Sequence, residues 1–340
     1  MYTNIISLGL GLISIPLVAS HPGQDHDKAA MKRREFLKNN VASLDHCGSK
    51  LDALGVTERS IQRRQSMIHG IREKRGLVAR DQGQDHEARN YNAEVGESSI
   101  FRSNASCVLA PEEDLGPYYV AGESIRSNII ENQTGVPIYL DIQFINVDTC
   151  QPVVGSYVDV WQANATGVYG GVVQQGSENR NDTWEETWGL TWLRGIQQTN
   201  KDGAVHFETI FPGHYEDRTT HIHVLTHPHA TLLPNKTIID DHASHVGQMY
   251  FDQDLIDRVE ELAPYNTNNQ PKLSNAEDKE LKGDLEAGGY PYLHYQLVGD
   301  ELADGLLAWL SFGILATEDK VVDPMTTYHP KPTKPANACA

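Results

Sequence analysis

The strongest constraint on the fold is a series of short segments in which apolar and polar residues alternate, with turn-forming residues between them. The clearest are residues 138–147, 157–161, 204–210 and 222–225. Alternation of this kind gives a β-strand two chemically different faces, and these strands are not interleaved with helical patterns as they would be in a parallel sheet. The sequence therefore predicts an all-β domain, an antiparallel β-sandwich.

Other regions complete the predicted organisation. Apolar residues at helical spacing indicate helices within residues 28–75. Later in the chain we expect a short acidic helix at 252–263, a polar loop at 264–289, and strands at 293–298 and 306–315. The predicted divisions are a signal peptide over residues 1–20, a helical segment and linker over 21–100, the β-sandwich over 101–318 and a flexible tail over 319–340.

The first twenty residues carry no charged side chain, and the apolar run at 5–18 ends at the small residues Val18-Ala19-Ser20. This run is too short to span a bilayer, and its end suits signal peptidase, so we predict a signal peptide and a secreted, extracellular protein. The alternative is a buried N-terminal strand. Five N-x-S/T sequons agree with export. They are Asn104, Asn132, Asn164, Asn181 and Asn235.

The basic cluster Arg72-Glu73-Lys74-Arg75 closes the N-terminal helical pattern. In an exported protein such a cluster can be a processing site, which would make the chain up to about residue 75 a pro-region. The alternative is an ordinary helix end, where basic side chains favour the helix dipole. The sequence leaves both interpretations open.

The charge balance limits the partners. The chain has 28 basic and 46 acidic residues, a net charge of −18. Nucleic acids and anionic membrane surfaces are themselves negative, so we expect neither as a partner.

The pattern His221-Ile222-His223 lies in one of the predicted strands. Residues two apart on a strand point to the same face, about 7 Å apart at the backbone, so both imidazoles can approach one metal ion. Two tyrosines also stand near strand ends beside glycine-containing turns: Tyr169 follows the strand at 157–161, and Tyr215 follows the strand at 204–210. Each of these residues alone is more often a packing residue, but together they indicate a metal site.

The same residues belong to motifs that occur in one order along the chain. They are the segment from Cys107 to Tyr119, Val158-Asp159-Val160-Trp161 leading to Gly167-Val168-Tyr169, Gly195-Ile196-Gln197-Gln198-Thr199 with Asp202-Gly203, Pro212-Gly213-His214-Tyr215, Arg218-Thr219-Thr220-His221-Ile222-His223 and Gly247-Gln248-Met249-Tyr250-Phe251. With these motifs the chain resembles the intradiol ring-cleavage dioxygenases, in particular their secreted fungal branch. The resemblance is specific over residues 107–250 and extends more loosely to about residue 315.

The resemblance implies one Fe(III) ion per chain, held by Tyr169, Tyr215, His221 and His223 with a solvent hydroxide as fifth ligand. Elementary chemistry agrees, because a free tyrosine has a pKa of about 10 and ionises at neutral pH only on a strong Lewis acid. Two phenolates and one hydroxide also neutralise a trivalent ion, which suits a buried site. The implied reaction cleaves a small aromatic diol of the catechol type with O2, between the hydroxylated carbons, and gives a muconate-type product.

Further roles are implied by position in the motifs. Tyr215 is expected to leave the metal and accept a substrate proton, whereas Tyr169 stays bound. Arg218 is expected to stabilise charge on the ring, and Gln248 to supply a polar group near it. The residues that match the substrate mouth of the family are Pro117, Tyr118 and Tyr119. Aromatic walls there suit a planar ring, although ordinary packing explains both tyrosines equally well.

The sequence departs from the intracellular members of the family in three places. Only five residues separate Tyr215 from His221, so we expect more open substrate access. The N-terminal helical segment is short, which leaves the oligomeric state open. Asn164 is a sequon inside the signature, and we expect it to be unglycosylated or directed away from the metal.

Four cysteines allow three disulfide pairings. We expect Cys107 to pair with Cys150, which leaves Cys47 and Cys339 as a distant pair.

Two other functions stay open on the sequence. One is a secreted β-sandwich binding module without catalysis, which would be colourless, whereas ferric tyrosinates absorb visible light. The other is a zinc or copper enzyme built on the same histidines or on others in the chain. The others are His206, His214, His227 and His229. That interpretation lacks an H-E-x-x-H motif and a carboxylate at ligand spacing.

Overall fold

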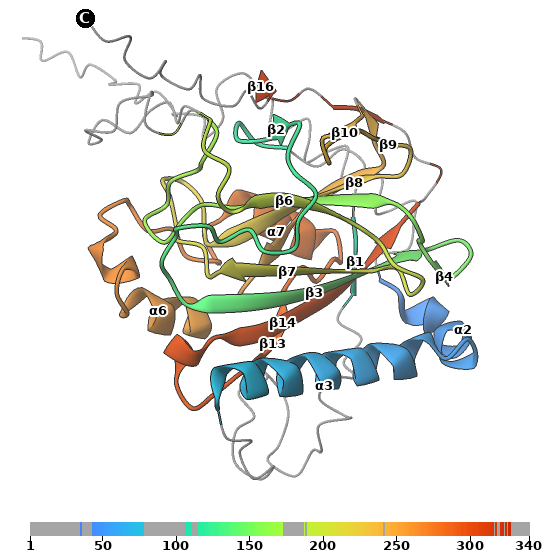
Figure 1. The fold of residues 1–340 in the computed structure, drawn as a ribbon, viewed down its shortest axis with the longest axis horizontal. Helices are drawn as coiled ribbons and strands as arrows, with labels where there is room; N and C mark the ends of the chain where they lie inside the picture. The colour runs from blue at the N-terminus through green and yellow to red at the C-terminus, as the bar shows by residue number, and fades with distance from the viewer. Residues whose placement is uncertain are drawn as a thin grey trace, which may run out of the picture.

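The computed structural model describes residues 43–77, 106–109, 115–172, 189–240 and 242–315, with single residues and short pieces up to residue 327. The predicted signal peptide, the sequons at Asn104 and Asn181, and Cys339 fall outside the described residues. Two β-sheets packed face to face form the body of the protein, with one long helix along its outer side (Figure 1).

The first sheet has six strands. They are β1 (Ser106–Val108), β3 (Pro137–Asn146), β4 (Gln151–Pro152), β7 (Ala204–Ile210), β13 (His294–Leu297) and β14 (Leu306–Ile314). The prediction of a β-sandwich is confirmed. Within it, β14 pairs parallel with both β3 and β1, while the other pairs are antiparallel. The pattern within single strands cannot reveal this, because the chain traverses the whole second sheet before β14 returns to β3.

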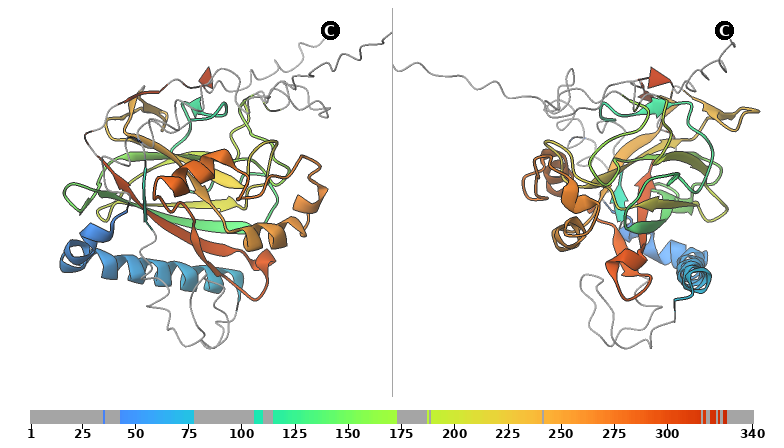
Figure 2. Two further views of the ribbon diagram at one scale, coloured as in Figure 1. Left: turned by 180° about the vertical axis from the view of Figure 1, so that it is seen from behind. Right: turned by 60° about the vertical axis from the view of Figure 1, so that its left-hand side comes forward.

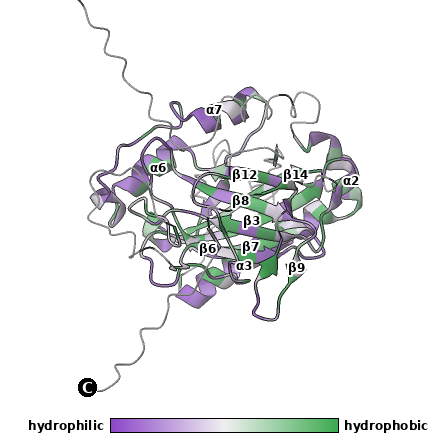
Figure 3. Ribbon diagram, turned by 90° about the horizontal axis from the view of Figure 1, so that it is seen from above, coloured by the Kyte–Doolittle hydropathy of each residue, from purple (hydrophilic) through white to green (hydrophobic). Residues whose placement is uncertain are grey.

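The second sheet has four antiparallel strands in the order β12-β8-β5-β6. They are β5 (Tyr157–Trp161), β6 (Arg194–Gln198), β8 (His221–His227) and β12 (His245–Tyr250). Alternate residues such as Val160, Ile222 and Val224 point into the core shared with the first sheet, where they meet Ile142 and Phe144. Figure 3 shows hydrophobic colouring on the strands in the middle of the view and more hydrophilic colouring on the helices around them. The opposite face of the second sheet is not needed for this core, so it can carry the polar side chains of a functional site.

Shorter elements surround the sandwich. The helical ones are η1 (Asp45–Cys47), α2 (Gly48–Ala53), α3 (Val56–Arg75), α6 (Gln253–Glu260), η2 (Tyr265–Thr267), α7 (Lys279–Glu286) and η3 (Leu302–Asp304). The remaining two-residue strands form the pairs β2 (Val120–Ala121) with β16 (Thr326–Thr327), β9 (Thr231–Leu232) with β10 (Ile238–Ile239), and β11 (His242–Ala243) with β15 (Lys320–Val321). In the described part of the chain, no helix has both the length and the apolar character needed to cross a bilayer.

The predicted helix at 252–263 is α6, but the segment predicted as a loop at 264–289 also contains η2 and α7. The eight residues of α7 include only two large apolar side chains, Leu281 and Leu285. A pattern that weak does not distinguish a helix from a polar loop.

Helix α3 covers the outer face of the first sheet (Figures 1 and 2). Its Ile61 and Ile68 pack against Leu307 and Trp309 of β14. Below the helix lies Asp141 of β3, which is fully buried and receives hydrogen bonds from two arginines of α3. The helical prediction for this segment is confirmed, and its apolar stripe faces the sheet as the spacing required.

A disulfide joins this N-terminal segment to the sandwich. Cys47 in η1 is bonded to Cys150, which follows β3, with 5.2 Å between their Cα atoms. The predicted Cys107–Cys150 pair is therefore wrong, and so is the pairing of Cys47 with Cys339. Val108, next to Cys107 on β1, packs in the same apolar cluster as Cys47 and Cys150, but it is η1 that brings a cysteine into bonding distance of Cys150.

Candidate active site and metal centre

Strand β8 presents its histidines on the face of the second sheet that is turned away from the core. His221 is in register with Tyr250 of β12, and His223 lies between Trp161 of β5 and Gln248 of β12. Ile222 points the other way into the core. The predicted placement of both imidazoles on one strand face is confirmed, because the side-chain period of a strand depends only on local geometry.

Tyr169 and Tyr215 lie on two loops whose backbones are in close contact. A Cβ on Gly167 would lie 2.1 Å from a carbonyl oxygen of the Tyr215 loop, and a Cβ on Gly213 would lie 2.4 Å from a carbonyl oxygen of the Tyr169 loop. The N–H of Gly213 also donates to the carbonyl oxygen of Asn164 at 3.0 Å. Only glycine permits such an approach at these positions, so the contact fixes one tyrosine relative to the other.

The four predicted metal ligands converge. Tyr215 Oη lies 3.1 Å from His221 Nε2, which lies 3.1 Å from His223 Nε2. The ring of Tyr169 stands edge-on to that of Tyr215, with 5.5 Å between centroids, and lies 6.1 Å from that of His223. All four side chains are buried. The structure thus brings together two phenols and two imidazoles from three separate stretches of the chain.

The hydrogen bond behind His221 determines which of its nitrogens faces the centre. His221 Nδ1 lies 2.6 Å from the carbonyl oxygen of Thr219. A carbonyl oxygen only accepts, so Nδ1 carries the hydrogen and Nε2 presents its lone pair toward Tyr215 and His223. Metal-binding histidines commonly have this arrangement.

Burial makes both phenols poor acids without a cation. It raises the pKa of Tyr169, an effect that the nearby Tyr215 hydroxyl partly offsets. Burial, followed by the charge of Tyr169, raises the pKa of Tyr215 well above its ordinary value. The Tyr169 hydroxyl also has no well-formed hydrogen bond among the described residues. A strongly charged, oxygen-preferring cation would reverse both shifts, so this donor set fits ferric iron.

Arg218 and Gln248, both predicted near the substrate, lie beside the ligands in one buried network. Arg218 Nη2 donates to Gln248 Oε1 and, at 3.1 Å, to the hydroxyl oxygen of Tyr250. Arg218 Nε donates to Asp278 at 2.9 Å. Burial opposes the charge of Arg218, but Asp278 and the neighbouring tyrosines hold its pKa well above the usual value. The guanidinium therefore stays charged next to the centre.

The three residues predicted to line the substrate mouth have different surroundings in the structure. Tyr118 stacks on Tyr169 with 4.3 Å between centroids and an interplanar angle of 18°, and it stands edge-on to Tyr215. Tyr119 instead packs against Trp161, with 5.2 Å between centroids. Pro117 is half-buried in the same loop. Of the three, the geometry favours Tyr118 as the surface for a planar ring.

A second arginine, Arg194, lies over the ring of Tyr169. The guanidinium of Arg194 lies 5.8 Å from the centroid of the Tyr169 ring, and its Nε donates to the carbonyl oxygen of Gly170 at 2.7 Å. Its Nη1 lies 3.1 Å from Glu123 Oε1. Burial, followed by the charge of Glu123, raises the pKa of the neighbouring Asp159 well above its usual range.

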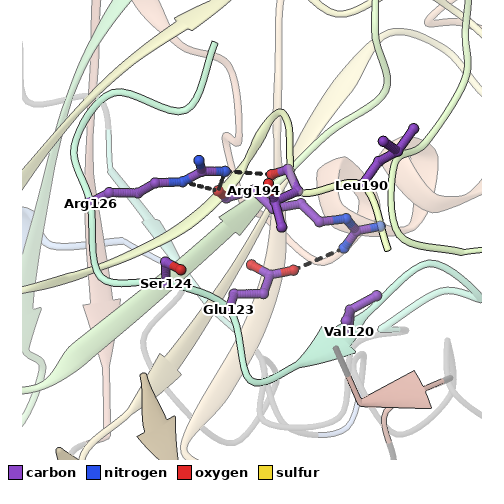
Figure 4. Close-up of a pocket in the computed structure, with 7 residues that line it drawn as sticks. Val120, Glu123, Ser124, Arg126, Leu190 and Arg194 are labelled. Atoms are coloured by element: carbon purple, nitrogen blue, oxygen red, sulfur yellow. Dashed lines mark hydrogen bonds and ion pairs between the residues drawn. The ribbon is translucent and has the colours of Figure 1, made fainter. Parts of the chain in front are cut away.

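The pocket in Figure 4 lies beside Arg194 and Glu123 rather than over the four predicted metal ligands. Its lining includes Val120, Glu123, Ser124, Arg126, Leu190 and Arg194. None of the four predicted metal ligands lines it. We therefore do not assign it to the substrate.

The histidines of the zinc or copper alternative do not gather at one place. Each has a separate environment: His206 lies 3.2 Å from Asp141, His214 2.6 Å from Glu260 and His227 3.5 Å from Asp240, while His229 is exposed. Among the described residues, the one group of three or more histidine, cysteine or carboxylate side chains close enough to share a metal is His46 with Cys47 and Cys150. Both of its sulfurs are held in the disulfide.

Sequence reasoning missed several residues that shape the centre. Trp161 stacks on the ring of His223 with 4.8 Å between centroids and an interplanar angle of 4°. Trp161 belongs to a motif noted in the sequence, which could have indicated this role. Thr219 was noted only within the motif from Arg218 to His223, and Arg194 and Asp278 carried no local signal, because their contacts depend on segments distant along the chain.

Comparisons with known proteins agree with this geometry. A family model described as "Dioxygenase" matches residues 115–280. An intradiol ring-cleavage dioxygenase from Tetranychus urticae is 28% identical, with 65% of this chain and 99% of that chain covered and a TM-score of 0.50. A second structure, the dioxygenase Tetur07g02040, is 29% identical, with 65% and 98% covered and the same TM-score of 0.50. No curated protein matches the chain.

These matches cover the strands and loops that carry both tyrosines and both histidines, and they favour an enzyme over a binding module. Over residues 115–280 the chain matches the dioxygenase family model, and its structure resembles those of the intradiol ring-cleavage dioxygenases.

Proposed function

We propose that the protein is a secreted Fe(III) enzyme that cleaves small aromatic diols with O2 between the hydroxylated carbons and releases muconate-type diacids. The observation that carries the proposal is the convergence of Tyr215 Oη with the Nε2 atoms of His221 and His223, at 3.1 Å each, beside the buried Tyr169. These four side chains would hold the metal, which would supply Lewis acidity toward the diol oxygens.

The surroundings of the two tyrosines explain why they would act differently. The positive charge of Arg194 over the ring of Tyr169 favours the ionised phenol and so favours permanent metal binding. Burial and the charge of Tyr169 raise the pKa of Tyr215, so Tyr215 Oη holds a proton tightly. Tyr215 is therefore the better acceptor for a proton from the diol.

Other residues would bind and orient the diol. Arg218 Nη1 is buried and has no hydrogen-bond partner among the described residues, which leaves a donor for an anionic ring oxygen. Tyr118 offers a flat surface that already stacks on Tyr169. An aromatic diol matches both features, because it combines a planar ring with acidic hydroxyls.

Visible absorption and oxygen uptake test this function. Iron-loaded protein should be coloured by tyrosinate-to-iron charge transfer, the band should shift on adding catechol, and oxygen should be consumed with catechol, protocatechuate or hydroxyquinol. Tyr169→Phe and Tyr215→Phe should each weaken and shift the band, whereas Tyr139→Phe, on the far side of the first sheet, should keep it. Colourless iron-loaded protein that consumes no oxygen with any of the three diols would refute the proposal.

The export part of the proposal is supported by the uncharged apolar N-terminus and by the Cys47–Cys150 disulfide, since disulfides persist mainly in oxidising compartments. N-terminal sequencing of protein from the culture medium should find a start near residue 21. Recovery of the chain only inside cells, with its first twenty residues intact, would contradict it.

A further inference from the structure

Asp278 lies at the N-terminus of α7, in the long connection between β12 and β13, yet its side chain reaches the metal centre. It is fully buried. Its Oδ1 accepts a hydrogen bond from the N–H of Leu281 at 2.9 Å and caps the helix. Its Oδ2 accepts from Arg218 Nε and from the N–H of Thr219, both at 2.9 Å. One carboxylate thus connects a helix cap with the loop that leads into β8.

The contact with Thr219 extends to a metal ligand. The carbonyl oxygen of Thr219 accepts the hydrogen of His221 Nδ1 at 2.6 Å, so the position of Thr219 determines where His221 Nε2 points. Thr219 is held a second time by its hydroxyl, which donates to Asn275 at 2.6 Å. Asp278 and Asn275 both come from the connection that precedes β13.

The contact with Arg218 fixes the other side of the centre. With Nε held by Asp278, the planar guanidinium directs Nη2 to Gln248 and Tyr250, and Nη1 stays available to substrate. The carboxylate also compensates the guanidinium charge. Without it, a buried cation would stand unpaired beside a bound metal cation, which is strongly unfavourable.

We propose that Asp278 is a positioning residue of this active site, which orients Arg218 directly and orients the ring of His221 through Thr219. The inference rests on the proposed Fe(III) function. Carboxylates that orient metal ligands in this way commonly change metal affinity or activity by about 10–100-fold when they are replaced. The same range is expected here.

The test is Asp278→Asn with Asp252→Asn as a matched control. Asparagine caps helices as well as aspartate does, so both variants should retain their helices. Asp252 is also a buried N-cap, for α6, and accepts from Leu255 at 2.9 Å. Iron titration of the apo-protein should show about 10–100-fold weaker binding for Asp278→Asn. Its charge-transfer band should move and its kcat should fall more than its KM changes, while Asp252→Asn should match the wild type.

The possible outcomes are distinguishable. Wild-type protein without a visible band or a response to catechol refutes the proposed function itself. A coloured, active wild type combined with unchanged iron affinity and band in Asp278→Asn overturns the inference. If circular dichroism shows that Asp278→Asn is unfolded, the double variant with Arg218→Gln removes the unpaired charge. If the double variant binds iron as tightly as Arg218→Gln alone, the proposed effect of Asp278 on the ring of His221 is overturned.

Discussion

The Cys47–Cys150 disulfide should contribute a large share of the stability of the fold. It joins η1 to the end of β3, and the bonded residues are 103 apart in sequence. Closing a loop of that size removes conformational entropy worth about 4.7 kcal/mol at 25 °C from the unfolded chain. Measured effects are commonly smaller, so Cys47→Ser should lower the free energy of unfolding by about 2–5 kcal/mol.

Urea unfolding followed by tryptophan fluorescence measures this effect. Reductant should lower the midpoint of the wild type at least to that of Cys47→Ser. Cys150→Ser is the matched variant and should unfold like Cys47→Ser, because each removes the same bond. Protein cut after Arg75 should keep its N-terminal fragment on a non-reducing gel and release it on reduction. A wild-type unfolding midpoint that does not change with reductant, or a peptide map that links Cys107 to Cys150, would refute the stabilising role of the Cys47–Cys150 bond.

Three further predictions concern stability, loop geometry and glycosylation. Asp141→Asn should cost about 3–5 kcal/mol in urea unfolding, because the buried Arg64 and the half-buried Arg63 lose their charge partner. Burial opposes the charge of Asp141, but these arginines hold its pKa well below the ordinary value of about 4. The contribution of Asp141 to the free energy of unfolding is therefore complete above about pH 4 and is lost as the pH falls further. Unfolding of the variant, measured as a function of pH, should lack this acid-dependent loss. Gly213→Ala should weaken iron binding in a titration, because its Cβ would meet the Ala165 carbonyl oxygen at 2.4 Å and displace the Tyr215 loop. Glycopeptide analysis should find Asn164 unmodified, since its side chain is held by hydrogen bonds, whereas the sequons at Asn132 and Asn235 are exposed and open to a glycan.

The parts of the site that could be predicted from sequence are those that depend on local geometry or on contiguous motifs. His221 and His223 share a face because they are two apart on a strand, and the motifs around Tyr169 and Tyr215 identified their partners. The partner of Cys150 could not be predicted this way, because it depends on where η1 packs after folding. Asp278 was missed for a similar reason, since a short helix with few apolar residues gives no periodic signal.

Charge compensation explains how two buried arginines can lie beside the proposed metal site. Arg218 is paired with Asp278 on one side of the centre, and Arg194 is paired with Glu123 on the other. Each ion pair adds directed hydrogen bonds without adding net charge, and so neither repels a metal strongly. The negative charge available to the metal then comes mainly from the two phenols. Because burial makes them ionise only when a strong Lewis acid binds, the centre should select a trivalent ion over a divalent one, and replacing either tyrosine by phenylalanine should reduce that selectivity.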